Sequence, residues 1–318
     1  MKKKAIMNRR AMLHISTLAA LGCISRSSIK DEPGASINFD LRADLEKRAI
    51  PSSGEKIPII GLGTWRTFDV DHSEEKRKTL RDVLNALVEK GASVIDSSPM
   101  YGSSETVVGD LSNELKIRPK LFLATKVWTP GKEEGIEQMN SSFRKMKVTK
   151  MDLMQVHNLI DVHTHLKTLR TWKEQEKIKY MGVTHYVPGS YPELMRLIKN
   201  ENLDFVQFNY NISAREAEKE LLPLAKDKGV AVIINRPFEE GALFQVVKGK
   251  ALPEWANLYD IQTWAQFFLK FIVSHPAVTC TIPGTSKVNH LEENLGAGSG
   301  KMPDDAGRKK MIEFFNSI

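Results

Sequence analysis

Short, nearly continuous apolar runs alternate along this chain with longer stretches in which apolar residues recur at helical spacing. Eight runs of four to six residues predict strands buried on both faces: Ile57–Leu62, Ser93–Asp96, Leu121–Lys126, Asp152–His157, Tyr180–Thr184, Phe205–Asn209, Val230–Asn235 and Val278–Pro283. Amphipathic patterns predict helices at Glu74–Lys90, Glu105–Leu115, Gly135–Met146, Leu166–Lys177, Ser190–Lys199, Ala214–Lys228 and Ile261–Val273. Gly91 and Gly229 follow two of these helices, as helix C-caps do. The alternation predicts a parallel sheet with helical crossovers.

Eight strands with seven or eight crossovers favour an α/β fold of the TIM-barrel type, a single closed (β/α)8 barrel, over an open sheet. No strand–GxGxxG–helix unit is present to support a Rossmann domain. We therefore expect residues 57–318 to form the barrel, preceded by a polar leader over residues 31–56. Ile57–Leu62 is either the first barrel strand or part of a hairpin that plugs the bottom, and periodicity leaves both open. Gly241–Asp260 predicts a long loop after the seventh strand, and Asp304–Phe315 a terminal helix.

The basic charge of the chain is concentrated at its N-terminus. Seven of the 46 basic residues lie within residues 1–30, which contain no acidic residue, and this leaves 39 basic against 39 acidic residues elsewhere. Binding to a phosphate backbone needs clustered excess cations, so the charge gives no support for a nucleic-acid partner. Two cysteines, Cys23 and Cys280, exclude a disulfide scaffold and a cysteine-rich zinc module.

An arginine pair precedes a short apolar run near the N-terminus. Arg9 and Arg10 are followed by Ala11–Ile24, which is too short and too polar for a stable membrane span but suits the apolar region of a signal. Residues 1–30 resemble a twin-arginine export signal, which implies the export machinery as a partner and a periplasmic location. A basic tail without an export role is the alternative. The residues before Cys23 partly resemble a lipoprotein processing site, so a lipid anchor at this cysteine is a further expectation.

Four reactive side chains lie at or just after the ends of predicted strands. Asp96, Lys126 and His157 each end an apolar run, and Tyr101 follows the first of them. Carboxyl ends of barrel strands meet at one rim, so these groups are expected to converge. A phenol with a pKa of about 10 needs a nearby cation to act as an acid–base group, and a buried lysine needs an anionic partner. We predict that Asp96 holds Lys126, that Lys126 lowers the pKa of Tyr101, and that Tyr101 exchanges a proton with a substrate oxygen.

Each of these side chains has a simpler interpretation when taken alone. A strand-end aspartate is often a helix cap, a lysine often extends along the surface, and a histidine often forms a hydrogen bond in the core. Their shared position at strand ends favours the functional interpretation, in which His157 orients the substrate oxygen.

From Ile57 to Asn294 the chain resembles the aldo-keto reductases. The resemblance is carried by six stretches in order: Gly61–Trp65, Asp96–Gly102, Ala124–Lys126, Asp152–His157, Gly182–His185, and Ile282–Thr285 running on to Glu293-Asn294. It implies a catalytic tetrad of Asp96, Tyr101, Lys126 and His157 with Tyr101 as general acid. It also implies an enzyme that transfers a hydride between a nicotinamide dinucleotide and a carbonyl or alcohol substrate.

The resemblance implies NADP(H), with NAD(H) as an alternative, bound across the rim of the barrel. The implied cofactor-binding residues are Thr64, Trp65, Asp96, Thr184, His185, Gln207, Asn235, Arg236, Pro237, Phe238, Thr285, Ser286, Lys287, His290, Glu293 and Asn294. The sequence departs from the family pattern at several positions. Asn235 stands where an aromatic residue often stacks on the nicotinamide, and His290 and Gly284 replace basic residues. Lys287 therefore supplies the main point charge for a 2′-phosphate.

Three aromatic residues and an asparagine are expected to form the substrate pocket. Trp65, Phe68 and Trp128 would wall it, although each could equally be ordinary packing. Asn158 follows the catalytic histidine and makes the pocket more polar. Little chain remains after Gly296 to cover the site, so an open pocket with broad acceptance of carbonyl compounds is expected.

Two other functions stay open at this point. His163 and His165 form an HxH pair of the kind that supplies two metal ligands in barrel hydrolases, but this pair lies at a helix start rather than at a strand end. A nicotinamide-binding sensor or interaction subunit with little turnover would keep the same four residues. We expect an enzyme without a metal and with a small-molecule substrate.

Overall fold

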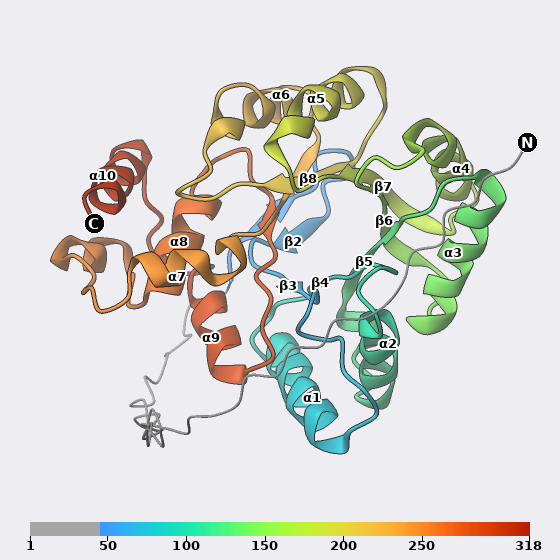
Figure 1. The fold of residues 1–318 in the computed structure, drawn as a ribbon, viewed down its shortest axis with the longest axis horizontal. Coiled ribbons are helices and arrows are strands. Elements are labelled where there is room, and N and C mark those ends of the chain that lie inside the picture. The colour runs from blue at the N-terminus through green and yellow to red at the C-terminus, as the bar shows by residue number, and fades with distance from the viewer. Residues whose placement is uncertain (1–44) are drawn as a thin grey trace, which may run out of the picture. The chain divides into compact units, whose positions relative to one another are not determined.

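Seven of the eight predicted apolar runs become barrel strands close to their expected positions. The computed structural model describes residues 45–318, in which eight parallel strands form a ring enclosed by helices (Figure 1). The strands are β3 (Leu62–Gly63), β4 (Val94–Asp96), β5 (Phe122–Val127), β6 (Met151–His157), β7 (Ile178–Thr184), β8 (Phe205–Asn209), β9 (Ala231–Asn235) and β10 (Cys280–Thr281). Each pairs with its neighbour in sequence, and the bridges Ile60–Thr281 and Gly63–Gly284 join the first strand to the last. The predicted (β/α)8 barrel is confirmed.

The eighth run, at residues 57–62, divides between two structures. Its beginning belongs to an antiparallel hairpin of β1 (Lys47–Ala49) and β2 (Lys56–Pro58), and its end is β3. Both predicted alternatives are therefore partly correct. Ile50 and Ile57 of the hairpin are buried with the side chains that fill the barrel interior. Within residues 47–56, the side chain of Ile50 thus packs into the barrel interior, whereas most of the other side chains of the hairpin are exposed.

Helices cover the outside of the ring, as Figure 1 shows. They are α1 (Glu74–Glu89), α2 (Ser104–Glu114), α3 (Lys132–Lys145), α4 (Val162–Glu174), α5 (Tyr191–Asn200), α6 (Leu221–Asp227), α7 (Ala242–Val246), α8 (Trp264–Val273), α9 (Val288–Gly296) and α10 (Asp305–Asn316). Gly91 and Gly229 have φ values of 81° and 64° after α1 and α6, as C-cap residues do.

Two predicted segments differ from the structure. The helix expected at 214–228 is divided: a 3-10 helix at Glu216–Glu218 precedes α6. The side chain of Asn211 accepts backbone hydrogen bonds from Ser213 and Ala214 and folds the start of this stretch into a turn. The loop expected at 241–260 contains α7 and a 3-10 helix at Glu254–Tyr259. Buried contacts of Leu243, Val247 and Ala256 with the main core stabilise these short turns, which local periodicity does not reveal.

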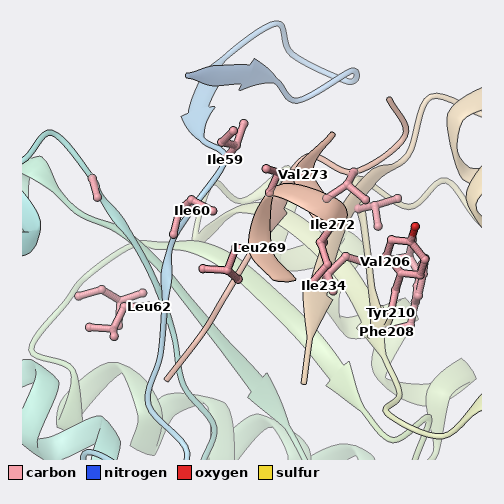
Figure 2. Close-up of a cluster of buried hydrophobic side chains, with 14 of the residues drawn as sticks. Ile59, Ile60, Leu62, Val206, Phe208, Tyr210, Ile234, Leu269, Ile272 and Val273 are labelled. Atoms are coloured by element: carbon pink, nitrogen blue, oxygen red, sulfur yellow. The ribbon is translucent and has the colours of Figure 1, made fainter. Parts of the chain in front are cut away.

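Alternate residues of each strand face two separate cores. Side chains that face outward, among them Val206 and Ile234, belong to the same buried cluster as Leu269 and Ile272 of α8 (Figure 2). Side chains that face inward, such as Phe122, Leu153 and Phe205, fill the lower barrel. Because side chains alternate along a strand, the inward series continues upward at every second position. At the carboxyl ends of the strands this inward series becomes polar.

Candidate active site

The inward positions at the tops of neighbouring strands carry most of the chemistry predicted from the sequence. Two residues above Val94 on β4 is Asp96, and two above Ala124 on β5 is Lys126. The same two-residue step along the inward face of the other strands leads to Gln155 and His157 on β6, Thr184 on β7, Gln207 on β8 and Asn235 on β9. Parallel register brings these ends to one rim. One hydrophobic alternation therefore builds both the core and the floor of the site.

Asp96 and Lys126 form a buried ion pair at this floor. The Lys126 Nζ donates to Asp96 Oδ2 at 2.5 Å and to the carbonyl of Ser97 at 2.7 Å, and the lysine is fully buried. Burial has the largest single effect and lowers the pKa of Lys126, but the charges of Asp96 and Tyr101 and the hydrogen bonds to both side chains together outweigh it, so the pKa is raised. The lysine therefore stays protonated, and the predicted Asp96–Lys126 contact is confirmed.

Two amide side chains hold the other oxygen of the aspartate. Asp96 Oδ1 accepts from Gln207 Nε2 at 2.9 Å and from Gln155 Nε2 at 3.2 Å. Gln207 Oε1 in turn accepts from Thr184 Oγ1 at 3.1 Å and from Asn235 Nδ2 at 3.4 Å. Gln155 is not among the site residues predicted from the sequence, although its place in the inward series of β6 indicates it. The network fixes the carboxylate, and through it the ammonium group of Lys126.

Tyr101 lies beside the lysine, with its ring centroid 5.1 Å from Lys126 Nζ. Burial raises the pKa of the Tyr101 phenol and outweighs the opposing effect of the Lys126 charge, so that the pKa lies above its ordinary value. Lys126 acts on the pKa of Tyr101 in the predicted direction and lowers it, but burial has the larger effect and sets the net direction. The ammonium group limits the increase that desolvation causes. At neutral pH the phenol carries its proton.

His157 completes the group. Its ring meets the Tyr101 ring edge-on with centroids 5.9 Å apart, and its Nδ1 lies 2.9 Å from Ser98 Oγ. Burial and then the charge of Lys126 lower the pKa of His157 to about 2, so the imidazole is neutral. When Ser98 donates to Nδ1, the hydrogen of the imidazole is on Nε2. A neutral ring can then donate one hydrogen bond without competing for the proton of the phenol.

A cavity of about 770 Å³ opens above these residues. Its walls include Trp65, Met100 and Trp128, whose side chains are about 40% exposed. Predicted site residues that line it are Thr64, Trp65, Asp96, Tyr101, Trp128, His157, Asn158, Thr184, Gln207, Asn235, Arg236, Pro237 and Phe238. The structure thus brings most of the predicted site to one hollow, which is large enough for a small ligand.

Phe68 is a correction to the predicted pocket. Its side chain is fully buried in the main hydrophobic core and does not contribute to the cavity. The backbone of Phe68 donates to the carbonyl of Thr64, so a tight turn follows β3. This turn directs Trp65 outward to the cavity and Phe68 inward to the core, and sequence spacing alone could not separate the two.

The remaining predicted cofactor residues lie outside the cavity wall. His185 stacks on Tyr186, with ring centroids 5.6 Å apart. The others lie at the end of β10 and along α9: Thr285, Ser286, Lys287, His290, Glu293 and Asn294. Thr285 Oγ1 accepts from the backbone of Lys287 at 3.1 Å and shapes the turn into this helix. Burial raises the pKa of Glu293.

The structure adds cavity residues that the sequence did not indicate. They are Arg66, Thr67, Met100, Tyr186, Glu240, Phe244 and Ile282, together with Gly63, Gly241 and Gly284. Glu240 pairs with Arg66 at 3.2 Å and with Arg236 at 3.1 Å. This ion-pair cluster joins the turn after β3 to the segment after β9. The two segments are distant from each other in sequence, and no periodic pattern predicts their contact.

The HxH pair does not form a metal site among the described residues. His165 is buried against the carbonyl of Thr129, whereas His163 is half exposed and lies beside Arg196. No group of three or more histidine, cysteine or acidic side chains placed to hold a metal is found in residues 45–318. The geometry gives the hydrolase interpretation no support.

The fold and the site define a (β/α)8 barrel with a carboxylate, an ammonium, a phenol and an imidazole at its carboxyl-terminal rim. The sequence pattern described as "Aldo/keto reductase family" matches residues 59–307. The chain therefore belongs to the aldo/keto reductase family and is an oxidoreductase.

Relatives in several organisms agree with this assignment. The chain is 27% identical over 259 residues to methylglyoxal reductase YeaE of Escherichia coli, covering 79% of this chain and 89% of that one. It is 24% identical to the NADP-dependent D-sorbitol-6-phosphate dehydrogenase of Malus domestica, covering 80% and 89%. The structure of an aldo/keto reductase from Klebsiella pneumoniae in complex with NADP and acetate superposes with a TM-score of 0.71 at 24% identity, covering 85% and 96%. This last likeness shows the fold.

Proposed function

We propose that this protein reduces carbonyl compounds with NADP(H), with Tyr101 as the general acid, and that it also catalyses the reverse oxidation. The observation that carries the proposal is the buried Asp96–Lys126 pair at the floor of the cavity, next to a protonated phenol and a neutral imidazole. The names of two relatives support the cofactor, since one is an NADP-dependent dehydrogenase and one was solved with NADP.

The residues around the cavity fit a nicotinamide dinucleotide. Asn235 Oδ1 and Arg236 Nε are buried at its wall without a hydrogen-bond partner. One acceptor and one donor at this rim are therefore available to a ligand. Thr184, Asn235 and Arg236 would hold the nicotinamide end. The turn at Thr285–Lys287 and the start of α9 would hold the adenosine end, with Lys287 for a 2′-phosphate.

The bound cofactor would supply the hydride that adds to the carbonyl carbon. Tyr101 would donate its proton to the carbonyl oxygen as negative charge develops there. Lys126 would stabilise the resulting phenolate, because its ammonium is held in place by Asp96 and cannot turn away. His157 would orient the substrate oxygen through its imidazole hydrogen. A sensor without turnover is not favoured, because the chain belongs to a family of oxidoreductases and its relatives include a methylglyoxal reductase and an NADP-dependent dehydrogenase.

Replacement of the proposed acid tests this function. Tyr101→Phe should lower the rate of NADPH oxidation with a simple aldehyde by about 10²–10⁴-fold, the usual contribution of general acid–base catalysis. NADPH binding, followed by fluorescence, should stay within about twofold of wild type because the phenol is not among the proposed cofactor contacts. Tyr180→Phe is the matched control, since that hydroxyl bonds Ser53 and Glu55 in the hairpin at the other end of the barrel. Equal activity of Tyr101→Phe and wild type would refute the proposed acid.

Export is a separate proposal, which rests on Arg9 and Arg10. Residues 1–30, which include Cys23, lie outside the residues that the structure describes. Within residues 45–318, no helix has both the length and the apolar character needed to cross a bilayer. We infer from the sequence that the folded barrel is exported, with a lipid anchor at Cys23 as the alternative end state. Cell fractionation of wild type and of the Arg9→Lys/Arg10→Lys variant tests this: periplasmic protein in both strains would contradict twin-arginine export.

A further inference from the structure

Trp128 controls the room beside the proposed catalytic group. It follows β5 two residues after Lys126, lines the cavity, and keeps 38% of its surface exposed. Its ring centroid lies 6.5 Å from that of His157. The Trp128 indole therefore lies beside a substrate whose oxygen reaches His157. The place of this indole decides how large the group next to the carbonyl can be.

Side chains from two neighbouring helices hold the loop that carries Trp128. Gln138 of α3 accepts from the Trp128 backbone N–H at 2.5 Å and donates to its carbonyl at 3.1 Å. Asp161, the residue before α4, accepts from the backbone N–H of Gly131 at 2.9 Å. His165 Nε2 of α4 lies 2.6 Å from the carbonyl of Thr129. Residues 128–131 have no regular structure of their own, so these bonds set the shape of the loop.

His165 is the buried member of this set. A carbonyl oxygen only accepts, so Nε2 must donate to Thr129. The other ring nitrogen, Nδ1, is buried without a partner, which is a cost that an apolar side chain at this position would avoid. The ring also requires Gly135 on α3, since a Cβ there would lie 2.3 Å from His165 Cε1. The hydrogen bond from His165 to the Trp128 loop is therefore kept although it leaves Nδ1 without a partner and requires a glycine inside α3.

We propose that His165 is a positioning residue that holds Trp128 as a rigid wall of the pocket and thereby sets how tightly flat aromatic carbonyl substrates bind relative to small aliphatic ones. The inference rests on the proposed carbonyl reductase function. Without the bond from His165, the half-buried Thr129 carbonyl loses its donor and the loop relaxes, so the indole no longer stays in one place. An aromatic aldehyde then loses its contact with the indole, whereas a small aliphatic aldehyde never makes that contact.

Steady-state kinetics with NADPH and two aldehydes tests the proposal. For His165→Leu, the KM for 4-nitrobenzaldehyde should rise about 5–10-fold, the loss expected for about one hydrogen bond. The KM for propanal and both kcat values should stay within about twofold of wild type. His165→Gln should restore the wild-type KM, because its amide nitrogen can replace Nε2, whereas His165→Asn should not. His163→Gln, two residues earlier on the same helix but on the exposed side, is the matched control.

A second variant and a spectroscopic measurement cover the case in which His165→Leu does not fold. Gln138→Leu removes the two bonds to the Trp128 backbone from a less buried position and should raise the same KM. In protein labelled with 5-fluorotryptophan, the Trp128 ¹⁹F signal, assigned with Trp128→Phe, should be single in wild type and in His163→Gln. It should shift or broaden in His165→Leu or, if that variant does not fold, in Gln138→Leu.

Failure of this inference differs from failure of the proposed function. Wild-type protein that reduces neither aldehyde contradicts the reductase proposal, and the ¹⁹F measurement still tests the role of His165. Equal changes of KM for both aldehydes, or an unchanged Trp128 signal in the variants, would overturn the positioning role while leaving the reductase proposal in place.

Discussion

Removal of the Lys126 charge is expected to lower the free energy of unfolding of the barrel as well as the rate of the reaction. In Lys126→Met the side chain keeps most of its length but loses the ammonium group. Lys126 is fully buried and donates to Asp96 and to the Ser97 carbonyl, and its aspartate partner is 2% exposed. This distinguishes the pair from surface ion pairs, whose net contribution to stability is about 0–1 kcal/mol.

The magnitude follows from what the substitution leaves behind. Asp96 Oδ1 keeps its bonds from Gln155 and Gln207, but Oδ2 loses its one donor and remains buried. Breaking a buried pair by removing one partner costs about 3–5 kcal/mol, because the remaining charge is not compensated. In the double variant Asp96→Asn/Lys126→Met no buried charge remains, so about half of this loss should be recovered. The free energy of unfolding of the double variant therefore lies above that of Lys126→Met alone.

Urea unfolding followed by circular dichroism at pH 7 measures these differences. The set comprises wild type, Lys126→Met, Asp96→Asn, the double variant, and Lys76→Met as a control. Lys76 pairs with Asp71 where both side chains are more than half exposed, so its loss should cost less than about 1 kcal/mol. An unfolding free energy of Lys126→Met within about 1 kcal/mol of wild type would refute the reasoning. A double variant less stable than Lys126→Met would refute it equally.

Other measurements address the proton, the packing and the cofactor. Because burial raises the pKa of Tyr101, the phenol stays protonated and kcat/KM for reduction should be flat from about pH 6 to about pH 9 and fall above that range. His157, with its pKa lowered to about 2, should produce no acid limb, and a limb near pH 6 that disappears in His157→Gln would contradict this. Gly109→Ala in α2 should lower the stability of the protein by about 1–3 kcal/mol in a thermal melt, since the new Cβ would lie 2.0 Å from a backbone carbonyl. This cost outweighs the better helix propensity of alanine. Gly189→Ala, whose Cβ would meet no close neighbour, should be nearly neutral. Lys287→Glu should raise the KM for NADPH about tenfold and leave the KM for NADH within about twofold, and equal effects on both would remove Lys287 from the 2′-phosphate site.

Much of the barrel and of the catalytic group could be predicted from the order of residues alone. Parallel strands buried on both faces must be short and apolar, and their side chains alternate between two faces. These two constraints are local, so they place Asp96, Lys126 and His157 at strand ends before any contact is known. The shared rim then follows from topology, because every strand of a parallel barrel ends on the same side.

Other features depend on contacts between distant segments. The division of residues 57–62 between a hairpin and a strand, and the burial of Phe68, depend on which apolar surface each residue meets. The contact of Arg66 with Glu240, and the hydrogen bond from His165 to the Trp128 loop, join segments that no short window contains.

The pKa of Tyr101 shows the same division in one group. The sequence places a phenol near a lysine, and this correctly predicts a cation that favours the phenolate. The net direction of the shift depends on how much water the folded chain removes from the hydroxyl, and here desolvation outweighs the charge. Alternation and spacing determine which groups face the same rim, because they act between near neighbours along the chain. Burial is a sum over the whole fold, so only the tertiary structure decides how strongly those groups act on one another.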